Sequence, residues 1–322
     1  MGILPIEVDI LPPCDDRIFK LLLTAPDAKP ALMSLLSAIL GRKVVDVVVH
    51  ANEVPNSDVN EKGERFDVNC KIDDGSQVNL EMQLHNMPEY RDGQRKNTKW
   101  RGVYYLTDLH SSQASKGLPR YDNLVRTYQV TFCAYNVFPH LPGFVNSFSL
   151  RHDETNELLC DAIQIIFVEL SKLEEIVKKP VSEMTDLEKW SVFFRYAQDL
   201  DYRATVNEVI ESEEGLQVAG EMLMSISKNE TERAIFRSRK KYEWDAVASM
   251  KVEMDEAREE GRAEGIAIGE ERGVKLGEKQ GRNVRNREIA QTALQMRMAI
   301  PDIAKLTGLS YEEIEHLRHI PN

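Results

Sequence analysis

Two short segments on either side of residue 74 alternate between apolar and polar residues. Phe66–Ile72 and Val78–Leu84 each place apolar side chains at every second position, and this period of two is typical of a β-strand. The three residues Asp73-Asp74-Gly75 fit a hairpin loop in which the glycine takes a left-handed conformation and forms a β-bulge. This loop pairs Asn69 with Asn79, and it is the register that keeps all the apolar side chains on one face.

Further elements are predicted on both sides of this hairpin. Apolar residues at helical spacing predict two helices within residues 15–40, divided at Pro26 and Pro30. Later positions predict a helix at 92–112 and strands at 43–49, 127–135, 144–150 and 163–170. Because helices and strands alternate, residues 1–170 are expected to form one α/β or α+β domain.

The strand pattern ends after this domain, and the rest of the chain reads as helical. Thr185 and Glu188 form a capping box, which predicts a helix start within a helical region at 171–260. Glycine then recurs at every fourth position from Gly261 to Gly281. Each glycine costs a helix about 1 kcal/mol relative to alanine. Residues 261–283 are therefore interpreted either as a charged helix for self-association or as a low-complexity spacer.

The last segment, 284–322, contains a pattern similar to a helix-turn-helix. Ala304 permits close helix approach, Gly308 fits the turn, and Ser310 fits the cap of the next helix. Three acidic residues follow this cap, where a DNA-reading helix needs donors that face phosphate: Glu312, Glu313 and Glu315. A protein contact or a degenerate role is therefore favoured over base reading.

Composition excludes several classes of protein. The 322 residues are 42% hydrophobic and 29% charged, which excludes a disordered chain and a disulfide scaffold. No apolar run approaches the roughly 18 residues that span a membrane, and the acidic start of the chain lacks the features of a secretory signal. Four scattered cysteines indicate reduced thiols, so we expect a cytoplasmic protein without a membrane partner. No phosphate-binding or dinucleotide-binding glycine motif supports a nucleotide cofactor.

The charge of the chain is unevenly distributed. The net charge of −12 argues against a nonspecific polyanion binder, yet residues 91–126 hold eight basic and three acidic residues. Lysine and arginine bind phosphate without reading sequence, so this stretch is a predicted DNA-backbone surface. Its four predicted contacts are Arg95, Lys96, Lys99 and Arg101. The alternatives are a solvated basic helix and, for Arg101, an ion pair with a carboxylate.

The hairpin carries the candidate chemistry. Its register places Asp67 opposite Glu81, with Cβ atoms roughly 5 Å apart. Two carboxylates at this distance repel each other unless a cation lies between them, and Mg²⁺ prefers carboxylates, waters and phosphate oxygens. Such a cation lowers the pKa of a bound water, and Gln83 on the same face can orient that water. The alternative is the ordinary polar outer face of an antiparallel sheet.

Five short motifs occur in an order that resembles a known family. They are Asp16-Arg17-Ile18-Phe19-Lys20, Arg65-Phe66-Asp67, Glu81-Met82-Gln83, Arg101-Gly102-Val103-Tyr104-Tyr105, and Gly117 and Tyr121 before the β-rich run at 125–138. Together they resemble the PD-(D/E)XK nuclease superfamily. More narrowly, they resemble its Rpn branch of recombination-promoting nucleases, also called PD-(D/E)XK family transposases. The resemblance covers roughly residues 12–170.

This resemblance implies a restriction-endonuclease-like core, with a mixed sheet flanked by helices. It implies a metal-dependent DNA endonuclease that hydrolyses phosphodiester bonds in recombination or transposition. Asp67 and Glu81 would ligate Mg²⁺ or Mn²⁺, Gln83 would help to position water, and Asp16 would be a further catalytic acid. The alternative for Asp16 is an acid that complements a helix dipole.

Gln83 departs from the superfamily pattern, because it stands where the superfamily has lysine. The site therefore lacks the positive charge of that position. The alternative function is a catalytically weak or inactive nuclease-fold scaffold, which binds DNA or protein partners and forms a homo-oligomer through its tail.

Overall fold

The computed structural model describes residues 2–50, 68–84, 98–114, 121 and 124–318. The chain forms two compact units, Met1–Arg237 and Ser238–Asn322. None of the helices in the described ranges is both long and apolar enough to cross a lipid bilayer.

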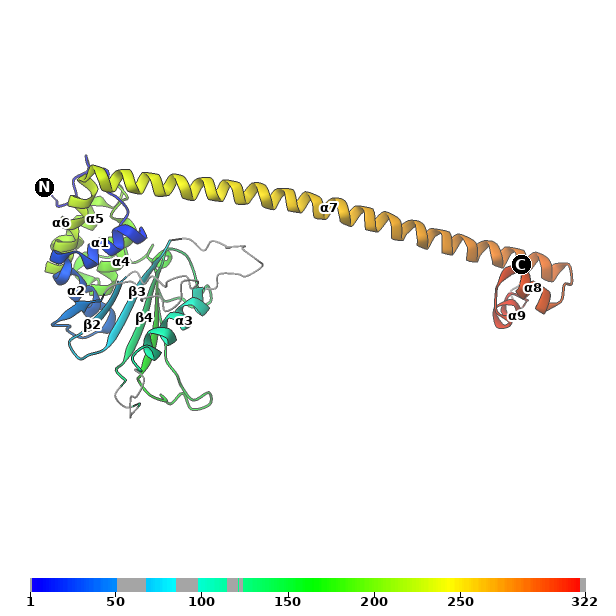
Figure 1. Ribbon diagram of the computed structural model, residues 1–322, viewed down its shortest axis with the longest axis horizontal. Coiled ribbons are helices and arrows are strands. Elements are labelled where there is room, and N and C mark those ends of the chain that lie inside the picture. The colour runs from blue at the N-terminus through cyan, green and yellow to red at the C-terminus, as the bar shows by residue number, and fades with distance from the viewer. Residues whose placement is uncertain (1, 51–67, 85–97, 115–120, 122–123, 319–322) are drawn as a thin grey trace. The chain divides into compact units, whose positions relative to one another are not determined.

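A six-stranded mixed sheet forms the centre of the first unit, with the strand order β1-β2-β3-β4-β6-β5. Figure 1 labels β2, β3 and β4 of this sheet. β3 and β4 are parallel, as are β4 and β6, and the other three pairs are antiparallel. The strands are β1 (Val47–Val49), β2 (Val68–Ile72), β3 (Gln77–Gln83), β4 (Thr127–Cys133), β5 (Val145–Phe148) and β6 (Ile163–Glu169). The helix α3 (Thr98–Ser111) lies in the connection between parallel β3 and β4, as parallel pairing requires a crossover.

The hairpin of β2 and β3 has the predicted register. Asn69 is paired with Asn79, and Gly75 has a φ angle of +87° in the loop. The N–H of Ile72 donates to the carbonyl of Ser76 at 3.0 Å, and the N–H of Gly75 donates to the carbonyl of Ile72 at 2.9 Å. The bulged loop and the pairing that it sets are therefore confirmed.

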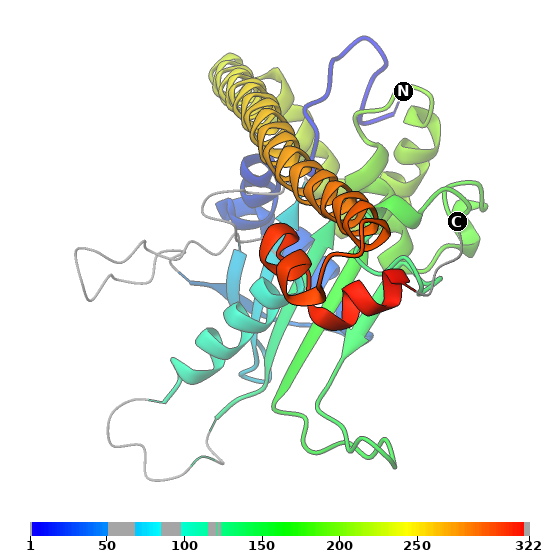
Figure 2. The ribbon, with the colours of Figure 1, turned by 90° about the vertical axis from the view of Figure 1, so that its right-hand side faces the viewer.

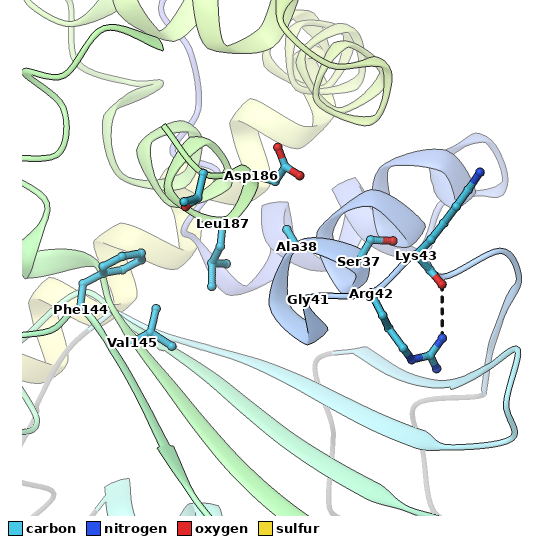
Figure 3. Close-up of a pocket in the computed structure, with 10 residues that line it drawn as sticks. Ser37, Ala38, Gly41, Arg42, Lys43, Phe144, Val145, Asp186 and Leu187 are labelled. Carbon is cyan, nitrogen blue, oxygen red and sulfur yellow. Dashed lines mark hydrogen bonds between the residues drawn. The ribbon is translucent and has the colours of Figure 1, made fainter. Parts of the chain in front are cut away.

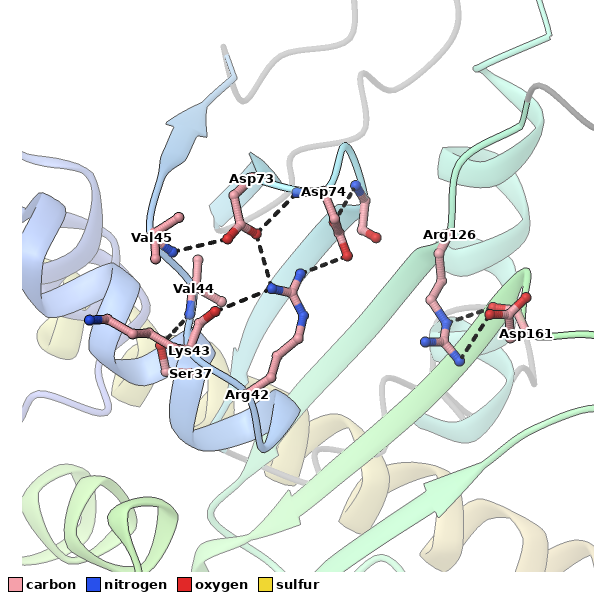
Figure 4. Close-up of polar contacts among 10 residues, drawn as sticks. Ser37, Arg42, Lys43, Val44, Val45, Asp73, Asp74, Arg126 and Asp161 are labelled. Atoms are coloured by element: carbon pink, nitrogen blue, oxygen red, sulfur yellow. Dashed lines mark hydrogen bonds and ion pairs between the residues drawn. The ribbon is translucent and has the colours of Figure 1, made fainter.

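Arg42 holds the tip of this hairpin from the neighbouring loop (Figure 4). Its guanidinium donates to Asp73 at 3.0 Å and to Asp74 at 2.6 Å. Asp73 also accepts the N–H of Val45 at 3.1 Å, and this bond, with Arg42, lowers the pKa of its carboxyl. The N–H of Val44 likewise donates to the Ser37 hydroxyl at 2.9 Å. Because side chains take these N–H groups, β1 starts at Val47, later than the residue 43 predicted from the valine-rich pattern.

Helices from both ends of the first unit cover one face of the sheet. They are α1 (Asp16–Thr24), α2 (Lys29–Leu40), α4 (Asp186–Tyr196), α5 (Arg203–Glu211) and α6 (Glu214–Lys228), with the short 3₁₀ turns η1 (Pro26–Ala28), η3 (Leu170–Lys172) and η4 (Val181–Glu183). A single cluster of buried side chains joins them to the apolar residues of β2 and β3. The domain boundary predicted at residue 170 runs through this core. The end of the strand pattern there marks a change from strands to helices within the unit. α4 begins at the predicted capping box of Thr185 and Glu188.

α3 covers the opposite face of the sheet. Figure 2 shows the first unit from the side on which α3 lies. Gly102, Leu106 and Leu109 are its buried residues. Gly102 faces β6, where an added Cβ would lie 3.4 Å from the ring of Phe167. A small second cluster with Cys133, Phe138 and Phe167 forms on this side.

The second unit consists of the greater part of α7 (Glu230–Gln295) followed by α8 (Ile300–Thr307) and α9 (Tyr311–Arg318). The segment 261–283 is helical throughout, and a Cβ added at any of its six glycines would meet no atom within 4 Å. Gly308 has a φ angle of +72° between α8 and α9, and Ser310 and Glu313 bond reciprocally to each other's backbone N–H. The predicted turn and cap are therefore confirmed. Ile303, Leu309 and Ile314 form a small core with Ala290 and Ala293.

Candidate active site

The polar face of β3 is buried. Asn79 is 0% exposed and Glu81 is 1% exposed, and Arg101 of α3 reaches Glu81. The sequence alternative of a solvated outer face does not describe this part of the sheet. A carboxylate withdrawn from water is unfavourable unless it is paired and hydrogen-bonded, so its partners define what the site can do.

Arg101 of α3 is a charged partner of Glu81. Its Nη2 donates to Glu81 Oε2 at 3.2 Å, and its Nη1 donates to Gln83 Oε1 at 3.1 Å. The guanidinium also lies over the ring of Tyr105, 5.0 Å from the ring centroid. The Arg101 side chain is 33% exposed whereas that of Glu81 is 2% exposed. Arg101 therefore connects a buried acid to the surface of the protein.

β4 extends this polar layer. Asn79 Nδ2 donates to Glu81 Oε1 at 3.2 Å and to Gln129 Oε1 at 2.8 Å. Gln129 Nε2 donates in turn to the hydroxyl of Thr131 at 3.3 Å. Gln129 and Thr131 were not among the sequence candidates, although the alternation of polar and apolar residues at 127–133 carries the same signal as the hairpin.

A small cavity of about 10 Å³ lies beside this layer. Its lining residues come from β3, β4 and α3: Glu81, Gln83, Thr98, Arg101, Gly102, Tyr105, Gln129 and Thr131. A volume of roughly 10–15 Å³ in this measure holds a single water molecule. Glu81 thus faces a small polar space with little free volume.

The donor set fits a hard divalent cation. The groups around Glu81 present carboxylate and amide oxygens, which are the ligands that Mg²⁺ and Mn²⁺ accept. Asn79 Oδ1 is buried and has no hydrogen-bond partner among the described residues, so an acceptor oxygen is left over beside the carboxylate. The described residues contain no group of three or more His, Cys, Asp or Glu side chains placed to hold a metal. A complete site therefore needs a further acid, water or phosphate.

The other sequence candidates have different placements. Asp67, Arg95 and Lys96 lie outside the described residues. Asp16 is the exposed first residue of α1, whose cap is Asp15. Lys99 lies with its Nζ 4.3 Å from the centroid of the Phe138 ring. For Arg101, the structure shows the ion pair with a carboxylate.

A larger hollow, of about 700 Å³, lies between α2, α4 and the start of β5 (Figure 3). Arg42, Lys43 and Asp186 line it together with apolar side chains such as Phe144 and Leu187. None of the predicted site residues contributes to it, and charges of both signs surround it. Size alone therefore does not identify the functional site.

A mixed sheet with helices on both faces, and a buried acid on a central strand, defines the class as a PD-(D/E)XK nuclease fold. The chain belongs to the PD-(D/E)XK nuclease family transposases, because the model of that family matches residues 13–253. No curated protein and no solved structure matches the chain. Membership supports a nuclease- and transposase-associated function, a DNA substrate and the divalent metal that such nucleases generally use. The match continues beyond residue 170 through α4, α5 and α6, which share the core of the sheet.

Proposed function

We propose that the protein is a divalent-metal-dependent DNA endonuclease, which hydrolyses phosphodiester bonds during recombination or transposition. The observation that carries the proposal is the burial of Glu81 on β3, within hydrogen-bonding reach of Arg101 and beside Gln83. A buried carboxylate is costly unless it is paired and hydrogen-bonded, so its presence on a central strand calls for a role beyond packing.

Each residue has a distinct role in this proposal. Glu81 and Asp67 hold the cation, which would be Mg²⁺ or Mn²⁺ and would activate a water and neutralise charge on the phosphate. Gln83 accepts a hydrogen bond from that water and orients it. Its role is limited to positioning, because an amide does not titrate at neutral pH and cannot act as a general base. Asp16 is retained as an additional acid. Lys99, Arg95 and Lys96 contact the DNA backbone.

Plasmid cleavage with Mg²⁺ tests the proposal. Glu81→Gln and Asp67→Asn keep the size of each side chain and remove its charge, so we expect cleavage to fall by about 100-fold or more, as for the loss of an electrostatic catalytic group. Glu175→Gln is the matched control, because Glu175 is 83% exposed in an i,i+3 pair with Lys178. Equal cleavage by all four proteins, with unchanged melting temperatures, would refute the assignment.

We also propose that the tail forms a homo-oligomer. Residues 244–271 of α7 contain nine acidic and three basic residues, whereas residues 272–287 contain six basic and one acidic. Antiparallel pairing of two copies sets the acidic part of one helix against the basic part of the other, while parallel pairing sets like charges together. The open glycine positions allow the two helices to approach closely.

Sedimentation of the full-length chain tests this association. We expect a dimer or larger species at low salt that dissociates as the salt concentration rises. The triple variant Lys275→Glu, Lys279→Glu, Arg282→Glu should be monomeric and should still cleave DNA. If this variant associates as the wild type does, charge pairing through α7 is wrong. A tail-dependent oligomer without any cleavage would instead support the scaffold alternative.

A further inference from the structure

We propose that Arg101 competes with the metal for Glu81, and that DNA removes this competition by drawing the guanidinium to a phosphate. Metal binding and DNA binding would then strengthen each other. The inference rests on the proposed function, and it assigns Arg101 a positioning and gating role in place of a simple backbone contact.

The first argument is the contact between Arg101 and Glu81. The guanidinium donates to Oε2 of Glu81 and to Oε1 of Gln83, at 3.2 Å and 3.1 Å. These are acceptor oxygens of the two β3 residues that would hold the cation and its water. A guanidinium stays protonated in proteins, so it leaves Glu81 by moving and not by losing a proton.

The second argument is the available volume. The cavity between β3, β4 and α3 is about 10 Å³, and Arg101, Thr98 and Tyr105 lie along its α3 side. Mg²⁺ keeps several waters when it binds to protein, whereas roughly 10–15 Å³ in this measure holds only one water. Movement of Arg101 away from Glu81 therefore makes room for a hydrated cation.

The third argument is the exposure of Arg101. Its side chain is 33% exposed and lies on the α3 side of the site, so a phosphate can reach it from solvent. The planar guanidinium forms paired hydrogen bonds with phosphate as it does with a carboxylate. Because one guanidinium cannot serve both partners fully, DNA that takes Arg101 removes its contact with Oε2 of Glu81, where the cation would bind.

This exchange also bears on the glutamine at position 83. Gln83 carries no positive charge of its own, and Arg101 supplies one from α3 at 3.1 Å. Arg101 thus stays close to the phosphate after the exchange, where it can offset negative charge. Two linked sites must affect each other equally, so DNA affinity should rise with metal by the same factor as metal affinity rises with DNA.

The test measures Mn²⁺ binding by the paramagnetic resonance signal of the free ion. The proteins are the wild type, Arg101→Gln, Arg101→Lys and Glu81→Gln, each full length and with or without a short DNA duplex. The matched control is Arg126→Gln, since Arg126 lies in the same basic stretch but pairs with Asp161 (Figure 4). Its side chain is 37% exposed, close to the value for Arg101.

Without DNA, we expect Arg101→Gln to bind Mn²⁺ about tenfold more tightly than the wild type, within the usual range of coupling between sites. The Mn²⁺ affinity of Arg126→Gln should match that of the wild type. The affinity of Arg101→Lys should lie between those of the wild type and Arg101→Gln, because lysine keeps the charge but lacks the paired N–H donors of the guanidinium. DNA should tighten Mn²⁺ binding to the wild type more than to Arg101→Gln. A duplex with uncharged methylphosphonate links should have no such effect.

A thermal melt covers the case in which Arg101→Gln folds poorly. Mn²⁺ should raise the melting temperature of this variant more than that of the wild type, since the cation replaces the lost partner of a buried acid. Equal or weaker Mn²⁺ binding by Arg101→Gln, with binding abolished in Glu81→Gln, overturns the competition but leaves the metal site intact. Equal Mn²⁺ binding by Glu81→Gln and wild type overturns the metal site and the competition together.

Discussion

The hydroxyl of Tyr135 lies 2.5 Å from the hydroxyl of Thr98 and thereby joins the end of β4 to the first residue of α3. One residue further along α3, Lys99 packs over the ring of Phe138. Both contacts lie within one helical turn of Arg101. The segment that follows β4 therefore fixes the end of the helix that carries the partner of Glu81.

Tyr135→Phe removes only this hydroxyl group. We expect the free energy of unfolding to fall by about 1 kcal/mol, the usual net value of one hydrogen bond. Cleavage should fall as well, because the first turn of α3 positions Arg101. Denaturant melts and plasmid cleavage measure the two effects. Tyr311→Phe, at a side chain that is 59% exposed, should change neither.

Glu169 is a buried acid of a different kind, with a complete set of partners. It accepts the N–H groups of Val137 and Phe138, the latter at 2.8 Å, and it pairs with Lys172. Glu169→Gln leaves the ammonium of Lys172 without its charge partner, so we expect a loss of about 3–5 kcal/mol in the free energy of unfolding. Glu175→Gln should cost about 1 kcal/mol or less, because its pair is exposed. Similar losses in both variants would contradict this reading.

Gly75 provides a test of the hairpin loop. Its φ angle is +87°, and an added Cβ would lie 3.6 Å from the nearest atom of Val125, so there is space for alanine. Gly75→Ala should still cost about 1–2 kcal/mol through the left-handed backbone alone. Gly143→Ala, where φ is not positive, serves as the control in the same denaturant melts. No loss at position 75 would show that the loop adopts another turn.

His110 makes stability depend on pH. Its Nδ1 lies 2.8 Å from the hydroxyl of Thr127, and burial lowers the pKa of the imidazole below 6.5. The folded state therefore favours the neutral ring. The neutral ring of His110 therefore contributes its full stability above about pH 6.5, the pKa of histidine in the unfolded chain. This contribution is lost as the pH falls through the lower pKa of the folded state.

The variant His110→Asn removes this titration. The difference in unfolding free energy between wild type and variant should decline when the pH is lowered from about 7.5 to about 5.5, across the histidine range. Denaturant melts at each pH measure it. A difference that stays constant with pH would exclude His110 as the titrating group.

The cysteines should differ in reactivity. Burial raises the pKa of Cys70 and of Cys133 to about 12, whereas Cys160 is exposed. Because the thiolate is the reactive form, iodoacetamide at about pH 8 should label Cys160 in the folded protein and spare Cys70 and Cys133. Mass spectrometry of the digest identifies the labelled positions. Unfolding in denaturant should make all of them reactive.

Some features of the fold were predictable because they depend on neighbours in the chain. The alternation on either side of Gly75 determines the pairing of β2 and β3, since a slip of one residue exchanges the two faces. The cap at Thr185 and the turn at Gly308 depend on local backbone bonds in the same way. These interactions span only a few residues, so the sequence pattern contains them.

The surroundings of Glu81 were harder to predict from the sequence, because segments distant in the chain supply them. The alternation marks Glu81 as facing away from the apolar core, but it does not say whether water or a helix meets that face. α3 covers it, and Gln129 reaches it from β4 only because β3 and β4 are parallel neighbours. The same holds for α4, α5 and α6, whose apolar residues indicate burial without indicating the sheet that they cover.

The enclosed layer of Asn79, Glu81 and Gln129 has an evolutionary and practical consequence. Well-packed apolar residues of similar volume in place of buried ionic groups often leave a fold equally stable or more stable. Selection for thermal robustness alone should therefore replace these polar residues and remove the proposed metal site. Engineers who wish to raise its working temperature should accordingly redesign positions in the core shared with α1, α2, α4, α5 and α6 and leave this layer unchanged.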